Sequence, residues 1–265
     1  MEVIANEVRY VENLLESKKL NPKRVTKDIR LIVQYYLVRG ESPDEILNKV
    51  ILFINEVNGD SSGERWKRTI KGAIKDLLKK NDLKMREVDK ITFTKNEIEA
   101  IKTLSTKNQK KCAWGLLVLC KIINNGKESR WVTIEHLSKF CRMVGVNTST
   151  SKKRGMIFNE LLQNGLIKVS FRTGSESIEV LFEDKVEGEI TISTYNKFTK
   201  EENYFHNAML LFEKLFLNKK VYECKVCKTQ VPITTKTRKY CEVCAEEVKR
   251  GRIKIIKNNQ KYMNM

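Results

Sequence analysis

Four cysteines arranged in two CxxC pairs constrain this chain more than any other feature. Cys224 and Cys227 form the first pair, thirteen residues follow, and Cys241 and Cys244 form the second. Two residues between paired cysteines let both thiolates reach one ion from a tight turn, and zinc prefers tetrahedral sulfur ligation. Four thiolates fill that shell, so we expect one structural Zn2+ with no open position for water or substrate.

Two other chemistries use the same residue types. An iron–sulfur cluster or a redox dithiol would also need paired cysteines. The basic, β-branched insert TQVPITTKTRKY between the pairs favours a zinc ribbon, which we expect over residues 221–250. A unit of this size cannot fold on hydrophobic burial alone, so the metal should supply most of its stability.

The other three of the seven cysteines are Cys112, Cys120 and Cys141, which sit among apolar neighbours. We interpret them as core thiols rather than a reactive site. Paired cysteines in a chain without a disulfide framework are typical of a reducing compartment. We therefore expect a cytoplasmic protein, and we find neither a run of ~18 apolar residues that could span a membrane nor a signal peptide at the N-terminus.

The charge balance points to an anionic partner. Lysine and arginine total 51 against 33 aspartate and glutamate, which gives a net charge of +18. Such a surface attracts polyanions, so DNA, RNA and an anionic membrane are all candidates on charge alone. The charge informs association and solubility and does not specify a fold.

Residues 1–88 have the pattern of a helical domain. Ile29, Val33 and Tyr36 recur at three- and four-residue spacing, as expected for helices with one face on a shared core. Pro22 and Pro43 stand where a first helical turn tolerates proline. We place the boundary near residue 88, before a short β-prone run and a new helix start in which Thr94 and Glu97 have capping-box spacing.

Residues 89–185 have the element order of a winged-helix domain. Three helical stretches, KKCAWGLLVLCKIINN, WVTIEHLSKFCRMVGV and TSTSKKRGMIFNELLQNG, precede two β-prone runs around Thr173, Gly174, Ser175 and Glu176. A strand and an amphipathic helix over 186–220 should dock on this unit or on a second copy. The overall fold class is therefore mainly α (α+β), with a basic tail over 251–265.

The third helix of the winged-helix unit is the predicted reading helix. Ile157, Phe158, Leu161 and Leu162 would face the core and leave a polar, basic N-terminal half toward solvent. Winged-helix proteins commonly insert this helix into the major groove, where basic and amide side chains reach bases and phosphates. The predicted nucleic-acid contacts are Ser149, Ser151, Lys152, Lys153 and Arg154 on the helix, Lys168 and Arg172 on the hairpin, and Lys236, Arg238 and Lys239 between the cysteine pairs.

Three function hypotheses follow. No phosphate-binding loop, dinucleotide motif, HExxH or GxSxG is present, so we expect a protein that is not an enzyme. The first hypothesis is a protein that binds duplex DNA. Because winged helices and zinc ribbons also dock proteins, an interaction module for a replication, transcription or defence component stays open, as does an RNA-binding regulator.

Several stretches resemble a known group of proteins. These are KDIRLIVQYYLVRGESPDEILNKV, ITFTKNEIEAIKTLSTKNQKKCAWGLLVLCKI and the ending RKYCEVCAEEVKR. They are similar to uncharacterised winged-helix and zinc-ribbon proteins encoded by phages and prophages of Gram-positive bacteria. The resemblance implies a phage protein of the host cytoplasm that serves as an accessory factor in replication or transcriptional control.

Overall fold

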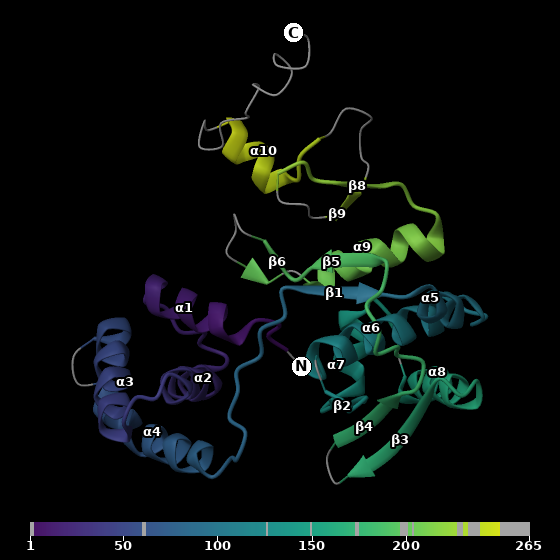
Figure 1. Cartoon of the computed structure of the whole chain (residues 1–265). Coiled ribbons are helices and arrows are strands. Elements are labelled where there is room, and N and C mark those ends of the chain that lie inside the picture. Colours follow the sequence, from purple (N-terminus) through teal and green to yellow (C-terminus); the bar gives the residue numbers. More distant parts are fainter. Residues whose placement is uncertain are drawn as a thin grey trace. The chain divides into compact units, whose positions relative to one another are not determined.

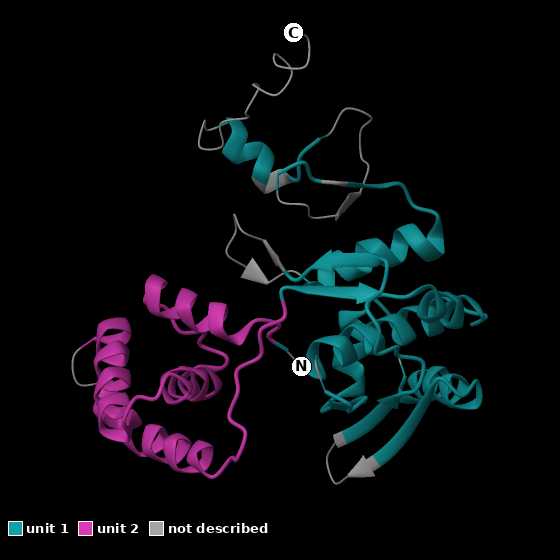
Figure 2. Ribbon diagram, viewed as in Figure 1, with its two compact units in different colours: residues 1–3, 89–265 teal, residues 4–88 magenta. Residues whose placement is uncertain are grey.

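The computed structural model is mainly helical with small sheets, which confirms the predicted mainly α (α+β) class (Figure 1). The chain divides into one compact unit over 4–88 and another over 1–3 and 89–265 (Figure 2). The structure describes residues 3–59, 62–125, 127–148, 150–172, 175–196, 201–202, 204–226, 230–232 and 239–249.

The unit over 4–88 is built from amphipathic helices around one apolar core. Its helices are α1 (Glu7–Ser17), α2 (Val25–Val38), α3 (Pro43–Asn58) and α4 (Ser62–Leu78). Ser42 and Glu45 form a capping box, and Pro43 occupies the first turn of α3 as predicted. Pro22 instead lies in the turn before α2, so its predicted place in a first helical turn is wrong.

A central long helix organises the second unit. After β1 (Lys90–Phe93) come α5 (Lys95–Lys102), with the predicted Thr94 and Glu97 capping box, and the largely buried α6 (Lys107–Ile123). Trp114 of α6 stacks on Phe93 with ring centroids 4.3 Å apart and donates its indole N–H to the Ala208 carbonyl at 2.8 Å. Ala208 belongs to α9, so this contact docks α9 on α6.

Three strands and two further helices follow α6. The elements are β2 (Trp131–Ile134), α7 (Leu137–Met143), α8 (Ser151–Gln163), β3 (Ile167–Arg172) and β4 (Ser175–Val180). The strands form an antiparallel sheet in the order β2-β4-β3, with Arg172 opposite Ser175 at the end of the β3–β4 hairpin.

Two details of this region differ from the sequence prediction. Residues 131–134, predicted as helix, form β2, because the buried Val132 and Ile134 alternate with exposed neighbours and pair with β4. Leu162, predicted to face the core, is 44% exposed. The buried face of α8 is completed by Ile157, Phe158 and Leu161 without it.

Short elements complete the chain. They are β5 (Ile190–Ser193), which pairs with β1, then β6 (Tyr195–Asn196), β7 (Glu201–Glu202), α9 (Tyr204–Leu217), β8 (Val221–Glu223), β9 (Gln230–Pro232) and α10 (Glu242–Lys249). In the described part of the chain, none of the helices combines the length and apolar character needed to cross a lipid bilayer.

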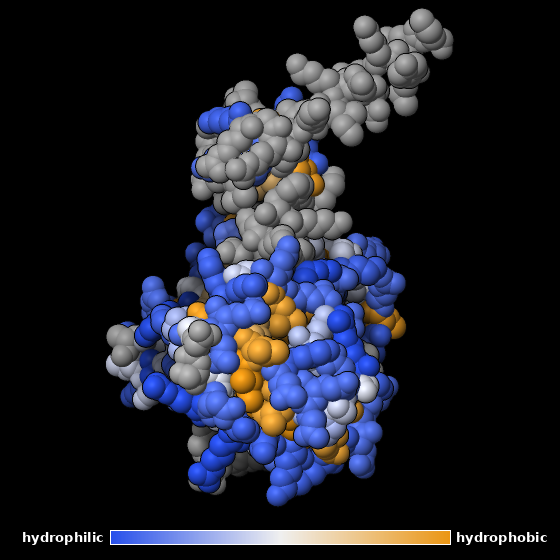
Figure 3. Space-filling model, turned by 90° about the vertical axis from the view of Figure 1, so that its left-hand side faces the viewer, coloured by the Kyte–Doolittle hydropathy of each residue, from blue (hydrophilic) through white to orange (hydrophobic). Residues whose placement is uncertain are grey.

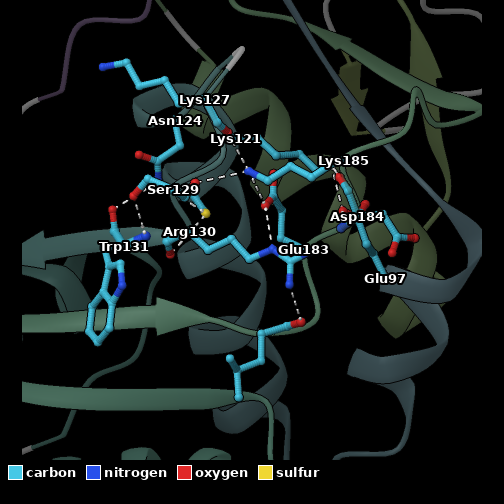
Figure 4. A network of polar contacts seen from close by, with 12 residues as sticks. Glu97, Lys121, Asn124, Lys127, Ser129, Arg130, Trp131, Glu183, Asp184 and Lys185 are labelled. Carbon is cyan, nitrogen blue, oxygen red and sulfur yellow. Dashed lines mark hydrogen bonds and ion pairs between the residues drawn. The ribbon is translucent and has the colours of Figure 1, made fainter.

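A buried ionic network fastens α5 to α6 and to the loop before β5 (Figure 4). One carboxylate oxygen of Glu97 accepts from the Lys121 ammonium at 2.7 Å and from the Asp184 backbone N–H at 2.8 Å. Its other oxygen accepts from the Thr94 N–H and closes the capping box. Burial raises the pKa of Glu97, and the Lys121 ammonium opposes that rise.

Candidate metal centre and nucleic-acid interface

Three of the four predicted metal ligands lie together in the interior of the C-terminal segment. The Sγ atoms of Cys224, Cys241 and Cys244 all lie within 4.8 Å of one another, and all three residues are buried. A tetrahedral zinc with Zn–S bonds of ~2.3 Å places its sulfurs about 3.8 Å apart. The cluster can therefore bind a metal ion. Cys227, the fourth predicted ligand, lies outside the described residues.

The surrounding backbone is arranged as it is around metal thiolates. The Cys241 N–H donates to the Cys224 Sγ at 3.3 Å, and the Cys244 N–H donates to the Cys241 Sγ at 3.4 Å. Hydrogen bonds of this kind stabilise negative charge on sulfur, and a metal-bound thiolate carries such charge. The donors and the acceptors thus fit a metal ion held by sulfur.

Local secondary structure positions the three sulfurs. Cys224 follows β8, which pairs with β9, while Cys241 and Cys244 lie just before and within the first turn of α10. The Tyr222 hydroxyl donates to the Tyr240 carbonyl at 2.8 Å and joins the β8 side of the site to the α10 side. This arrangement brings the two halves of the cysteine motif together, as their spacing predicts.

The remaining cysteines belong to the core of the second unit, as predicted. Cys112, Cys120 and Cys141 are buried and unlinked. Burial raises the pKa of Cys120 to about 11, and a hydrogen bond to Cys141 together with burial raises the pKa of Cys112. The same hydrogen bond lowers the pKa of Cys141. Raised thiol pKa values make Cys112 and Cys120 poor nucleophiles.

The N-terminal half of α8 is polar and basic, as predicted. Ser151, Lys152 and Lys153 are exposed, and Thr150 caps the helix by accepting the Lys153 backbone N–H at 3.3 Å. Lys152 and Lys153 have no side-chain hydrogen bond or ion pair within the described residues. The helix start therefore presents two uncommitted ammonium groups beside its positive dipole end.

Arg154 is more constrained than its neighbours. It is half-buried, and its guanidinium donates to the Thr148 carbonyl at 3.2 Å. It lines a shallow concavity of about 310 Å³ between α7 and the start of α8, together with Arg142, Asn147 and Ser138. The Thr148 hydroxyl, also in this lining, is buried and has no hydrogen-bond partner in the described part of the chain.

Sequence reasoning missed the contribution of α7 to this surface. Arg142 lines the concavity and Lys139, three residues earlier, is exposed. A usable signal existed, because Phe140 and Cys141 define the buried side of α7 and leave Lys139 and Arg142 toward solvent. The basic surface therefore extends over two helices.

The other predicted nucleic-acid residues are dispersed. Lys168 on β3 is exposed, with its ammonium 4.0 Å from the Glu179 carboxylate across the sheet. Lys239 is exposed next to the cysteine cluster. Arg172 belongs to β3, but its side chain lies outside the description, as do Ser149, Lys236 and Arg238.

One polar cavity of the second unit is a structural feature rather than a site. Its volume is about 450 Å³, and the network of Figure 4 lies along it. Lys90 pairs with Glu187 at 2.9 Å, Lys121 with Glu97, and Lys185 with Glu183 at 2.9 Å. Because these cations are already neutralised within the protein, the cavity offers little net charge to a ligand.

Comparisons with known proteins add no assignment. No protein-family model, no curated protein and no solved structure matches this chain.

Proposed function

We propose that this chain binds duplex DNA and acts by binding rather than by catalysis. The observation that carries the proposal is the basic surface on α7 and the start of α8, where Lys152 and Lys153 have no partner among the described residues and Arg142 and Arg154 line a concavity. Uncommitted cations at an exposed helix start suit phosphates and base edges in a groove, and a helix N-terminus adds a favourable dipole.

The topology supports assigning α6 through β4 as a winged helix. The order helix, strand, helix, helix, hairpin is observed, and the first strand lies beside β4 in a sheet ordered β2-β4-β3. In winged-helix proteins the helix before the hairpin enters the major groove, and here that helix is α8. The β3–β4 hairpin is the wing, and Lys168 on its first strand is suited to a phosphate contact.

We assign the cysteine cluster to one structural Zn2+ in a zinc ribbon. The three buried sulfurs and their N–H donors support sulfur ligation, and Cys227 completes the set by sequence spacing. Bound zinc would hold β8 against α10, and among the described residues of this segment the only buried cluster is formed by the three cysteines with Tyr222, Val226 and Tyr240 packed on it. The ion would stabilise the fold of this segment.

The proposal is tested by fluorescence anisotropy with a labelled duplex, a single strand of the same sequence and a structured RNA. We expect the duplex to bind with a Kd below ~10 μM at about 50 mM salt and to weaken steeply as salt rises. Preference for the RNA in direct competition would favour the RNA-binding alternative. Failure of all three nucleic acids to bind at low salt would reject a nucleic-acid function.

The protein-interaction alternative has a separate test. Capture of a host replication, transcription or defence protein should be repeated after nuclease treatment of the lysate. A partner that is bridged by DNA is lost on this treatment, whereas a direct protein contact persists.

A further inference from the structure

The unit over 4–88 has an apolar groove between two of its helices. The groove has a volume of about 390 Å³ and lies between the first turns of α3 and the last turns of α4. At the other end of the same helix pair the helices touch closely, because a Cβ added at Gly63 would lie 2.6 Å from the Ile51 carbonyl oxygen. The residues lining the groove are Pro43, Asp44, Leu47, Lys71, Ile74, Lys75, Leu78 and Lys79.

The floor and one wall of the groove are apolar. Leu47 and Ile74 form part of the domain core, while Leu78 remains 57% exposed. Large apolar side chains that stay exposed in this unit, within the described residues, are Val38, Leu52 and Leu78. Figure 3, which faces the side of α3, shows apolar surface gathered in a band with hydrophilic surface on both sides. Apolar surface of this kind is typical of a contact site.

The α4 edge of the groove is basic. Lys71 and Lys75 lie on α4, Lys79 directly follows its last residue, and these three lysines, four residues apart, are all exposed. Within the described residues none of them has an ion-pair partner. Side chains at this spacing rise ~6 Å per step along one side of a helix. The groove therefore has a row of unneutralised ammonium groups, with Asp44 as the single acidic residue of its lining.

We propose that this groove binds an acidic amphipathic helix of a partner protein. Two or three apolar side chains of the partner, spaced three or four residues apart, would insert against Leu47, Ile74 and Leu78. Carboxylates spaced four residues apart on the flank of that helix would contact Lys71, Lys75 and Lys79. Residues at this spacing lie on one side of a helix, so the two rows of charges would run alongside each other. The methylene stems of the lysines extend the apolar wall.

The apolar floor distinguishes this surface from a nucleic-acid contact. A duplex presents phosphates and sugars, which gain nothing from Leu47, Ile74 or the exposed Leu78, and DNA surfaces on proteins are strongly polar. The basic surface on α7 and α8 has the opposite character, because charged and polar side chains line it. The two surfaces thus serve different partners, and the unit over 4–88 becomes the protein-docking part of the chain.

The test uses the full-length protein and three labelled peptides of about 18 residues, long enough to form helix in contact. The first has leucines on one face and glutamates along the flanks of that face. The second has the same composition in scrambled order, and the third has lysines in place of the glutamates. We expect the first peptide to bind at least about tenfold tighter than the other two.

Matched variants locate the binding to the groove. Lys71→Glu with Lys75→Glu should weaken the acidic peptide about tenfold or more, and Leu78→Ser should weaken it independently of salt. Arg65→Glu with Lys80→Glu makes the same charge change on exposed residues of the same region outside the groove, and it should leave the affinity nearly unchanged. Circular dichroism confirms that each variant is folded.

Three outcomes overturn the proposal. The scrambled peptide could bind as tightly as the amphipathic one, or the two double variants could weaken binding equally, which would indicate general charge attraction. Alternatively, Lys71→Glu with Lys75→Glu could lower the affinity for duplex DNA while leaving the peptide unaffected. DNA binding through α8 is measured separately, so its failure leaves the groove result interpretable.

Discussion

The carboxylate of Glu97 and the ammonium of Lys121 lie 2.7 Å apart, with side chains 0% and 9% exposed. This ion pair joins the first turn of α5 to α6, and the same carboxylate accepts the Asp184 backbone N–H. A buried ion pair of this kind adds little stability compared with a pair of apolar side chains. Removal of only one member, however, leaves a buried charge without its partner. The second unit therefore depends on both members being present together.

The first prediction concerns the pair itself. Glu97→Gln removes the negative charge and leaves the Lys121 ammonium in a buried position. We expect the free energy of unfolding to fall by about 3 kcal/mol, measured by urea denaturation. Glu99→Gln, a matched change at an exposed position of the same helix, should cost less than about 1 kcal/mol. An equal loss of unfolding free energy in Glu97→Gln and Glu99→Gln would contradict a stabilising role for the buried ion pair.

The second prediction is a pH dependence. Burial raises the pKa of Glu97, and Lys121→Met removes the main opposing charge, so the folded pKa should rise further. A carboxyl with a raised folded pKa contributes stability that is complete below its unfolded pKa and is lost as pH rises through the folded pKa. The stability deficit of Lys121→Met relative to the natural chain should therefore be smaller at pH 4 than at pH 8. A deficit that shrinks as pH rises would refute this.

The third prediction concerns the seven cysteines. With metal bound, a bulky thiol reagent should find few accessible thiols, because the described cysteines are all buried. Chelation should release the four cysteines of the CxxC pairs, and guanidinium should then expose Cys112, Cys120 and Cys141. Spectrophotometric titration counts the steps. If a chelator did not change the number of reactive thiols, the result would argue against a bound metal.

A single substitution tests whether those sulfurs share one ion. Cys241→Ser should abolish metal binding and unfold only the C-terminal segment, with the helical units retained by circular dichroism. Loss of the whole fold would mean that the site stabilises more of the chain than we propose.

The fourth prediction uses two glycines. A Cβ at Gly115 of α6 would lie 2.3 Å from Val144 and 3.2 Å from Phe140, so Gly115→Ala should destabilise the protein by about 2 kcal/mol. A Cβ at Gly72 of α4 meets nothing within 4 Å, and Gly72→Ala should stabilise by up to about 1 kcal/mol. Thermal melts that shift in the same direction for both variants would contradict the packing described.

The sequence predicted the features that depend on short-range chemistry. The capping box at Thr94, the β3–β4 hairpin and the gathering of Cys224 with Cys241 and Cys244 all follow from local residue types. The sequence pattern favours helix over residues 131–134, because a four-residue strand has too short an alternation to outweigh the helical pattern beside it. These residues form a strand because they pair with β4. The residues near 131–134 in the sequence do not reveal that pairing.

Features of the candidate sites that depend on tertiary contacts could not be predicted. The hydrogen bond to the Thr148 carbonyl orients the Arg154 guanidinium, and Arg142 of α7 lines the same concavity. The groove in the unit over 4–88 forms only where Leu47 of α3 meets Ile74 of α4. Sequence periodicity identified the helices, but it does not specify which faces of different helices pack against one another.

The most direct test of the central claim is the salt dependence of duplex DNA binding, measured by anisotropy for Lys152→Ala with Lys153→Ala. We expect this pair to weaken binding about tenfold and to reduce the slope of log Kobs against log salt by roughly 2. Lys23→Ala with Lys27→Ala, which removes equal charge from exposed residues of the other unit, should leave the slope unchanged. Equal slopes for all three proteins would contradict the assignment of α8 as the DNA-contacting helix.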